Sequence, residues 1–253
     1  MSISKSEHKS IEEIKNLGNR AYSFLTRPNL VKKSTIAGFS VYSLTIIIGV
    51  IIAQFDPQGY NPVANYISDM GSFNHTPFPF LLDFGCMITS FLLLPTILYM
   101  EKLLAPLPEN TDDIRDLSRM RLRLGSYGFI WMIIGLIGMF GVGLFSEDRT
   151  AIIINNITLA TGLHWTFTIV VFGGLAIGGI FYGLLILFYD TLLPKLLGLY
   201  MLVVPSMSAA LAFGLGFPPI LEWMMFLSII AYLMIGGLIV LKHINQELGN
   251  KLK

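Results

Sequence analysis

The sequence is poor in charged residues and in cysteine. Charged side chains make up 13% of its 253 residues, against roughly 25% in soluble domains. A single cysteine, Cys86, excludes an intrachain disulfide framework. The net charge of +1 gives no reason to expect a nucleic-acid partner. This composition is untypical of a water-soluble protein.

Long apolar runs take the place of the missing charges. Six of them, each of about 20 residues, are long enough to cross roughly 30 Å of hydrocarbon at 1.5 Å per residue. They cover residues 34–54, 80–100, 124–145, 166–188, 196–214 and 223–241. We therefore predict an all-α polytopic membrane protein, built as a bundle of six transmembrane helices.

The basic residues are distributed unevenly between these runs. If both termini lie in the cytoplasm, 16 of the 17 Lys and Arg residues are cytoplasmic and only Arg149 is external. Lys and Arg resist translocation, so this count predicts that both termini are cytoplasmic. A basic inner face suits the anionic headgroups of a cytoplasmic leaflet, and we expect membrane lipids as partners.

Three segments follow from this topology. Residues 1–33 are predicted to form a cytoplasmic amphipathic segment, residues 34–241 the transmembrane domain, and residues 242–253 a cytoplasmic tail. The external stretch 146–165 is expected to contain a short interfacial helix. Glycines in the third and fourth spans are expected to serve intramolecular helix packing more than a dimer seam, although a homo-oligomer or a protein partner stays open.

Ionisable residues gather near the external ends of the predicted helices. Asp69 and His75 lie in the first external connection, Asp83 lies one turn inside the second span, and His164 and Glu222 open the fourth and sixth. An ionisable group that faces hydrocarbon costs several kcal/mol, so Asp83 should face the interior and have a partner. We expect this partner to be His164, with pKa values moved toward a functional range by burial.

Each of these residues also has an ordinary structural interpretation. Asp83 could bind loop amides, and Asp69 could build an Asx-type turn. Glu222 could be an acid at the positive end of a helix dipole. His164 could be an interfacial residue, and His75 could be solvated. The sequence leaves these alternatives open.

The first external connection also carries a recognisable motif. Its residues are Tyr60, Pro62, Tyr66, Ile67, Ser68, Asp69, Met70 and Gly71. This run resembles the Y-x-P…I-S-D-[LM]-G motif of a prokaryotic membrane family catalogued as domain of unknown function 998. More distantly it is similar to the DRAM/Sfk/FRAG membrane proteins. The resemblance covers residues 34–241 and implies six helices, a prokaryotic plasma membrane, lipid-related roles, and His164 as the counterpart of a histidine common in both groups.

These observations favour a pocket in the outer leaflet that binds or modifies a lipid or lipid-linked headgroup. The candidate catalytic residues are His164 as general base, with Asp83 and Asp69 as its orienting partners. The candidate binding residues are Tyr60, Tyr66, Ser68, His75, Trp165 and Glu222. Neither a metal nor another cofactor is predicted, and whether the protein is an enzyme stays open.

Two alternative functions are compatible with the same sequence. The first is a proton-coupled carrier for a small solute, in which Asp83 titrates and Pro95 and Pro205 break helices beside the pathway. The second is a non-catalytic scaffold or sensor that uses its glycine-rich helices and its basic inner face.

Overall fold

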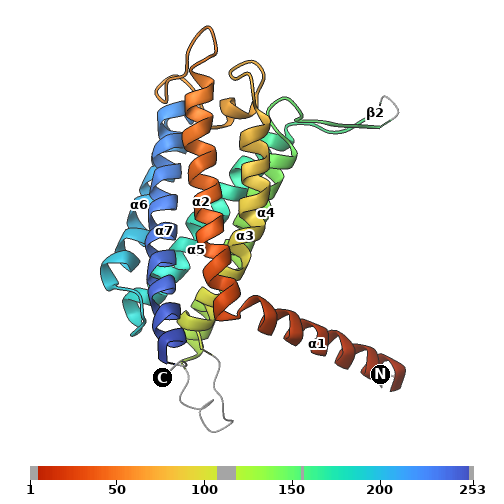
Figure 1. Ribbon diagram of the computed structural model, residues 1–253, viewed down its shortest axis with the longest axis vertical. Helices are drawn as coiled ribbons and strands as arrows, with labels where there is room; N and C mark the ends of the chain where they lie inside the picture. The colour runs from red at the N-terminus through yellow and green to blue at the C-terminus, as the bar shows by residue number, and fades with distance from the viewer. Residues whose placement is uncertain (1–4, 107–117, 155–156, 251–253) are drawn as a thin grey trace.

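Six long helices stand side by side in the computed structural model, which describes residues 5–106, 118–154 and 157–250 (Figure 1). They are α2 (Pro28–Ala53), α3 (Phe80–Leu104), α4 (Arg119–Leu144), α5 (Leu163–Phe188), α6 (Lys195–Gly214) and α7 (Pro219–Asn250). All six are long and apolar enough to cross a bilayer. The chain is therefore an all-α integral membrane protein with six candidate spans, as its sequence predicts.

The helices form a ring in chain order. Each spanning helix packs against the next, and α2 contacts α7 to close the ring. Large buried side chains, among them Met132, Tyr182 and Tyr232, fill the interior. The Tyr232 hydroxyl donates a hydrogen bond to the Leu175 carbonyl at 2.7 Å, which satisfies this polar group in an apolar environment.

Glycines allow α4 and α5 to approach closely. A Cβ atom placed on Gly174 would lie 2.7 Å from the Cα atom of Gly135, and one on Gly178 would lie 2.9 Å from the Cγ atom of Met132. Small residues permit such contact between backbones, and van der Waals packing holds helices together where lipid supplies no hydrophobic drive. These glycines therefore serve packing within one chain, as predicted.

The helices differ from the predicted spans at several of their ends and at two prolines. α2 begins at Pro28 instead of Ser34, because proline suits the first turn of a helix. α7 extends to Asn250, so most of the predicted tail is helical; residues 251–253 lie outside the described part. α3 and α6 run without interruption through Pro95 and Pro205, so neither proline breaks its helix.

The N-terminal segment forms a separate helix, α1 (Lys5–Leu25), which points away from the bundle (Figure 1). Near its end, the Tyr22 hydroxyl donates a hydrogen bond to Oε2 of Glu101 in α3 at 3.1 Å. Leu17 and Phe24 are 70% and 51% exposed. The predicted amphipathic segment therefore contains a helix, and this helix leaves apolar side chains uncovered.

Three connections lie at the end of the bundle opposite α1, which we call the distal end (Figure 1). Their described residues are 54–79, 145–154 with 157–162, and 215–218. The second contains an antiparallel hairpin of β1 (Ile152–Ile154) and β2 (Ile157–Ala160). The prediction of a short helix here is wrong, because this run is rich in β-branched residues, which favour strands.

Candidate functional site

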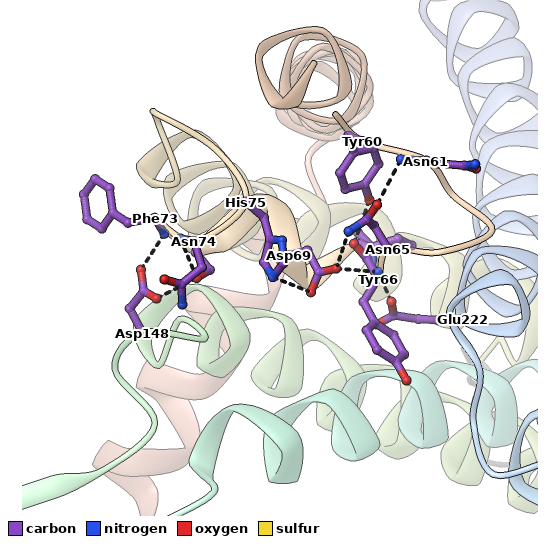
Figure 2. A network of polar contacts seen from close by, with 12 residues as sticks. Tyr60, Asn61, Asn65, Tyr66, Asp69, Phe73, Asn74, His75, Asp148 and Glu222 are labelled. Carbon is purple, nitrogen blue, oxygen red and sulfur yellow. Dashed lines mark hydrogen bonds and ion pairs between the residues drawn. The ribbon is translucent and has the colours of Figure 1, made fainter. Parts of the chain in front are cut away.

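Asp69 organises the first distal connection. It lies in the short 3-10 helix η1 (Ser68–Gly71) and is 5% exposed. Its Oδ2 atom accepts hydrogen bonds from the Tyr66 backbone N–H at 2.9 Å and from the Asn65 side-chain amide at 3.2 Å. Nε2 of His75 lies 4.0 Å from Oδ1. Figure 2 shows Asp69 between these partners, so this carboxylate serves the shape of the loop.

Glu222 joins this loop to α7. The residue lies in the first turn of the helix, as its sequence suggests, but it is only 3% exposed. Its Oε2 atom accepts a hydrogen bond from the backbone N–H of Ile67 at 2.7 Å (Figure 2). Trp223 donates to the Asn65 carbonyl at 3.2 Å. Burial and a partner far along the chain set Glu222 apart from an ordinary acid at a helix end.

Asp148, in the second connection, holds the far side of the same loop. Its carboxylate accepts hydrogen bonds from the Ser72 hydroxyl at 2.7 Å and from the backbone N–H of Phe73 at 2.8 Å (Figure 2). The motif-bearing loop is thus fixed by acids from two other segments. Both contacts were missed by reasoning from the sequence alone.

Asp83 forms an ion pair with Arg149. Oδ2 of Asp83 lies 2.7 Å from Nη2 of Arg149, and the Arg149 Nε–H donates to the Ser146 hydroxyl at 3.1 Å. The Asp83 side chain is 4% exposed and that of Arg149 is 56% exposed. Asp83 does have a partner, as membrane energetics require. The prediction that His164 is this partner is wrong, because Arg149, from the second distal connection, occupies that position.

His164 instead binds a backbone carbonyl. Its Nδ1 atom lies 2.7 Å from the Phe145 oxygen. A carbonyl only accepts, so Nδ1 carries the proton, and in the neutral ring Nε2 is an acceptor. Nε2 is buried and has no hydrogen-bond partner within the described residues. His164 is 7% exposed, and the contact with Phe145 fixes the orientation of its ring.

A cavity of about 310 Å³ opens beside His164 at the distal end. Its wall is formed by Tyr66, Ser68, Glu147, Thr150, Gly162, His164, Trp165, Thr168 and Glu222. Five of these residues belong to the predicted site. The wall does not include four other predicted residues, namely Tyr60, Asp69, His75 and Asp83. Tyr60 and Asp69 act instead inside the loop, where the Tyr60 hydroxyl donates to the Tyr66 carbonyl at 2.6 Å.

A second, narrow cavity of about 70 Å³ adjoins the first one. The two share Ser68, Thr168 and Glu222 as wall residues. The remaining wall is mostly apolar and reaches Leu93 and Leu233, several turns inside α3 and α7. A cavity with several polar side chains at the distal end therefore lies next to an apolar one that extends into the bundle.

The electrostatics of the distal loops are dominated by acids. Burial, with the charges of Asp69 and Asp148, raises the pKa of Glu147, while His75 lowers it. Burial and the charges of Glu222 and Asp69 raise the pKa of Tyr66, so this phenol remains a donor near neutral pH. The Oε2 atom of Glu147 is buried and has no partner within the described part of the chain.

One group of charged residues in the sequence could have indicated that the second connection contributes to this site. Glu147, Asp148 and Arg149 are consecutive, and they are the charged residues of the second connection. All three contribute to the distal end, through the cavity wall, the loop and the Asp83 ion pair. Among the described residues, no three His, Cys, Asp or Glu side chains are grouped so that they could hold a metal ion.

Fold and geometry together define an integral membrane protein with a polar cavity at one end of a six-helix bundle. No family model, no curated protein and no solved structure matches the chain in comparisons with known proteins.

Proposed function

We propose that the distal cavity binds the polar head of a membrane lipid or of a lipid-linked molecule. The observation that carries this proposal is the shared wall of the two cavities, at Ser68, Thr168 and Glu222. A volume of about 310 Å³ is within the range of small-molecule sites. A cavity with polar side chains beside an apolar one suits a molecule with a polar head and an apolar chain.

The same proposal includes the orientation of the protein. We place the distal end outside the cytoplasm, because only Arg149 among the Lys and Arg residues then crosses the bilayer. The resemblance of the motif to a prokaryotic family supports a prokaryotic plasma membrane. The cavity would open to the outer leaflet. A cysteine introduced at Gln58, in a background with Cys86→Ser, should react with an impermeant thiol reagent added to intact cells. Labelling only after lysis would show that the distal end faces the cytoplasm and would contradict this orientation.

We also propose that the chain belongs to the family catalogued as domain of unknown function 998. The support is that the motif residues cooperate at one place. Tyr66 and Ser68 contribute to the cavity wall, Ile67 contacts Glu222, and Asp69 holds the loop together.

Binding is the activity that this geometry supports best. If turnover also occurs, His164 is the candidate general base, because Nε2 is an available acceptor and the Phe145 carbonyl orients the ring. Asp83 has no direct part in that chemistry, since Arg149 engages it. The carrier alternative has less support, because α3 and α6 are not broken at their prolines.

A pair of threonine variants tests the binding proposal. Thr168 is buried and belongs to the walls of both cavities, whereas Thr166 is exposed on the same helix. Native mass spectrometry of the protein purified in mild detergent should show a bound lipid in the wild type and in Thr166→Phe. Thr168→Phe should lose it while the protein remains folded. Equal lipid occupancy in both variants would place the lipid elsewhere.

A further inference from the structure

Among the described residues, the wall of the distal cavity has two carboxyl side chains and neither Lys nor Arg. The two carboxyl groups are those of Glu147 and Glu222. Arg149 follows Glu147 by two positions, but Asp83 and Ser146 engage its guanidinium at 2.7 Å and 3.1 Å. A phosphate or carboxylate in the cavity would therefore meet two carboxyl groups without a compensating cation.

The unsatisfied polar atoms of the cavity residues are acceptors. Nε2 of His164 is an acceptor in the neutral ring, because Nδ1 donates to the Phe145 carbonyl. This nitrogen is buried without a partner, and the whole residue is only 7% exposed. Oε2 of Glu147 is likewise buried and without a partner among the described residues. Leaving buried acceptors unmatched is costly, so the complementary ligand supplies hydrogen-bond donors.

We infer that the molecule bound here carries a protonated primary amine, which the carboxylates of Glu147 and Glu222 and the imidazole of His164 receive. This inference rests on the lipid-binding function proposed above and specifies its headgroup. An ammonium group offers three donors and a positive charge, whereas a hydroxyl lacks the charge and a quaternary ammonium lacks the donors. The adjoining apolar cavity receives the start of the chain attached to the amine.

Four probes distinguish the contributions of positive charge, hydrogen-bond donors and apolar chain to binding. They are tetradecylamine, tetradecanol, tetradecyltrimethylammonium and ethanolamine. The protein is reconstituted into phosphatidylcholine nanodiscs. We expect the wild type to bind tetradecylamine about tenfold more tightly than either other chain-bearing probe, because hydrogen bonds to charged groups are the strong ones. The double variant Glu147→Gln/Glu222→Gln should lose this preference. The control Glu12→Gln/Glu13→Gln changes two exposed acids of α1 and should keep it.

The possible outcomes are distinct. Equal binding of the amine and the alcohol, both abolished by Thr168→Phe, would overturn the amine inference and leave the lipid site intact. The absence of saturable binding for every chain-bearing probe, with folded protein, would overturn both proposals. If ethanolamine competes as effectively as tetradecylamine, the amine inference is supported, and the ligand is a free amine instead of a lipid. If the double variant does not fold, Glu147→Gln alone carries the test, and an unchanged preference there overturns the inference.

Discussion

The Oε2 atom of Glu222 accepts a hydrogen bond from the backbone N–H of Ile67 at 2.7 Å, across 155 positions of the sequence. This single contact joins the motif-bearing loop to the first turn of α7. It also positions Ser68, the next residue, in the walls of both cavities.

Removal of the Glu222 acceptor should loosen the distal loop. Glu222→Ala leaves the N–H of Ile67, a buried residue, without a partner, which should cost about 1–3 kcal/mol of stability. Glu222→Gln retains a side-chain oxygen that can accept the same bond and should cost less. Thermal unfolding and limited proteolysis between residues 54 and 79 measure the difference. Equal proteolysis of Glu222→Ala and the wild type would show that the contact does not hold the loop.

Because Asp83 and Arg149 form an ion pair, we expect substitutions of these two residues to have coupled effects on stability. Arg149→Ala leaves a buried carboxylate without its cation and should destabilise the protein by about 1–2 kcal/mol, a figure reduced because Arg149 is half exposed. Asp83→Asn in addition removes the unpaired charge and should recover part of the loss. A double-mutant cycle followed by thermal unfolding measures the coupling. Additive effects of the two changes would contradict the prediction.

The raised pKa of Glu147 predicts a dependence of stability on pH. Burial raises this pKa above its ordinary value of 4.5, with Asp69 and Asp148 adding to the shift and His75 opposing it. The folded protein therefore holds the proton more tightly than the unfolded chain, and stability decreases as pH rises from 4.5 through the raised pKa.

Glu147→Gln removes this titration and supplies the measurement. The Tm of Glu147→Gln minus that of the wild type should increase with pH across the window in which Glu147 ionises. Scans from acid to neutral pH in one detergent give both curves. Parallel curves for the two proteins would mean that Glu147 titrates alike in the folded and unfolded states.

Neighbouring glycines in α5 provide a matched pair for the helix packing. A Cβ atom at Gly174 would lie 2.5 Å from the backbone nitrogen of Gly135, whereas one at Gly173 has no neighbour within 4 Å. Gly174→Ala should lower the Tm by forcing α4 and α5 apart. Gly173→Ala makes the same change in helix propensity and should be neutral or slightly stabilising. A similar Tm for both variants would exclude close packing at Gly174.

The sequence was sufficient for the parts of the fold that depend on local composition. Runs of about 20 apolar residues predict spanning helices without reference to a partner. The start of α2 was misplaced because Pro28 begins a helix while the flanking residues remain polar. The hairpin was missed because an apolar run near a membrane interface suggested a helix, although β-branched Ile153 and Thr158 favour strands.

The contacts of the candidate site were harder to predict from the sequence than the helices, because they join residues far apart in the chain. His164, Glu222 and Ser68 were found because ionisable and motif residues near helix ends draw attention. The partner of Asp83 was not found, since Arg149 lies 66 positions away in a connection whose path no periodicity specifies. Glu147 was overlooked as a wall residue for the same reason.

The short turn between α1 and α2 has a mechanical consequence. Thr26 and Arg27 alone separate the two helices, and Tyr22 is tethered to Glu101 on α3. Helix α1 therefore extends sideways from the bundle and is held to it at its C-terminal end. If the exposed Leu17 and Phe24 rest in the lipid surface, tilting the bundle must move α1 out of this surface or deeper into it. The tilt and the depth of the protein in the membrane are then restrained together.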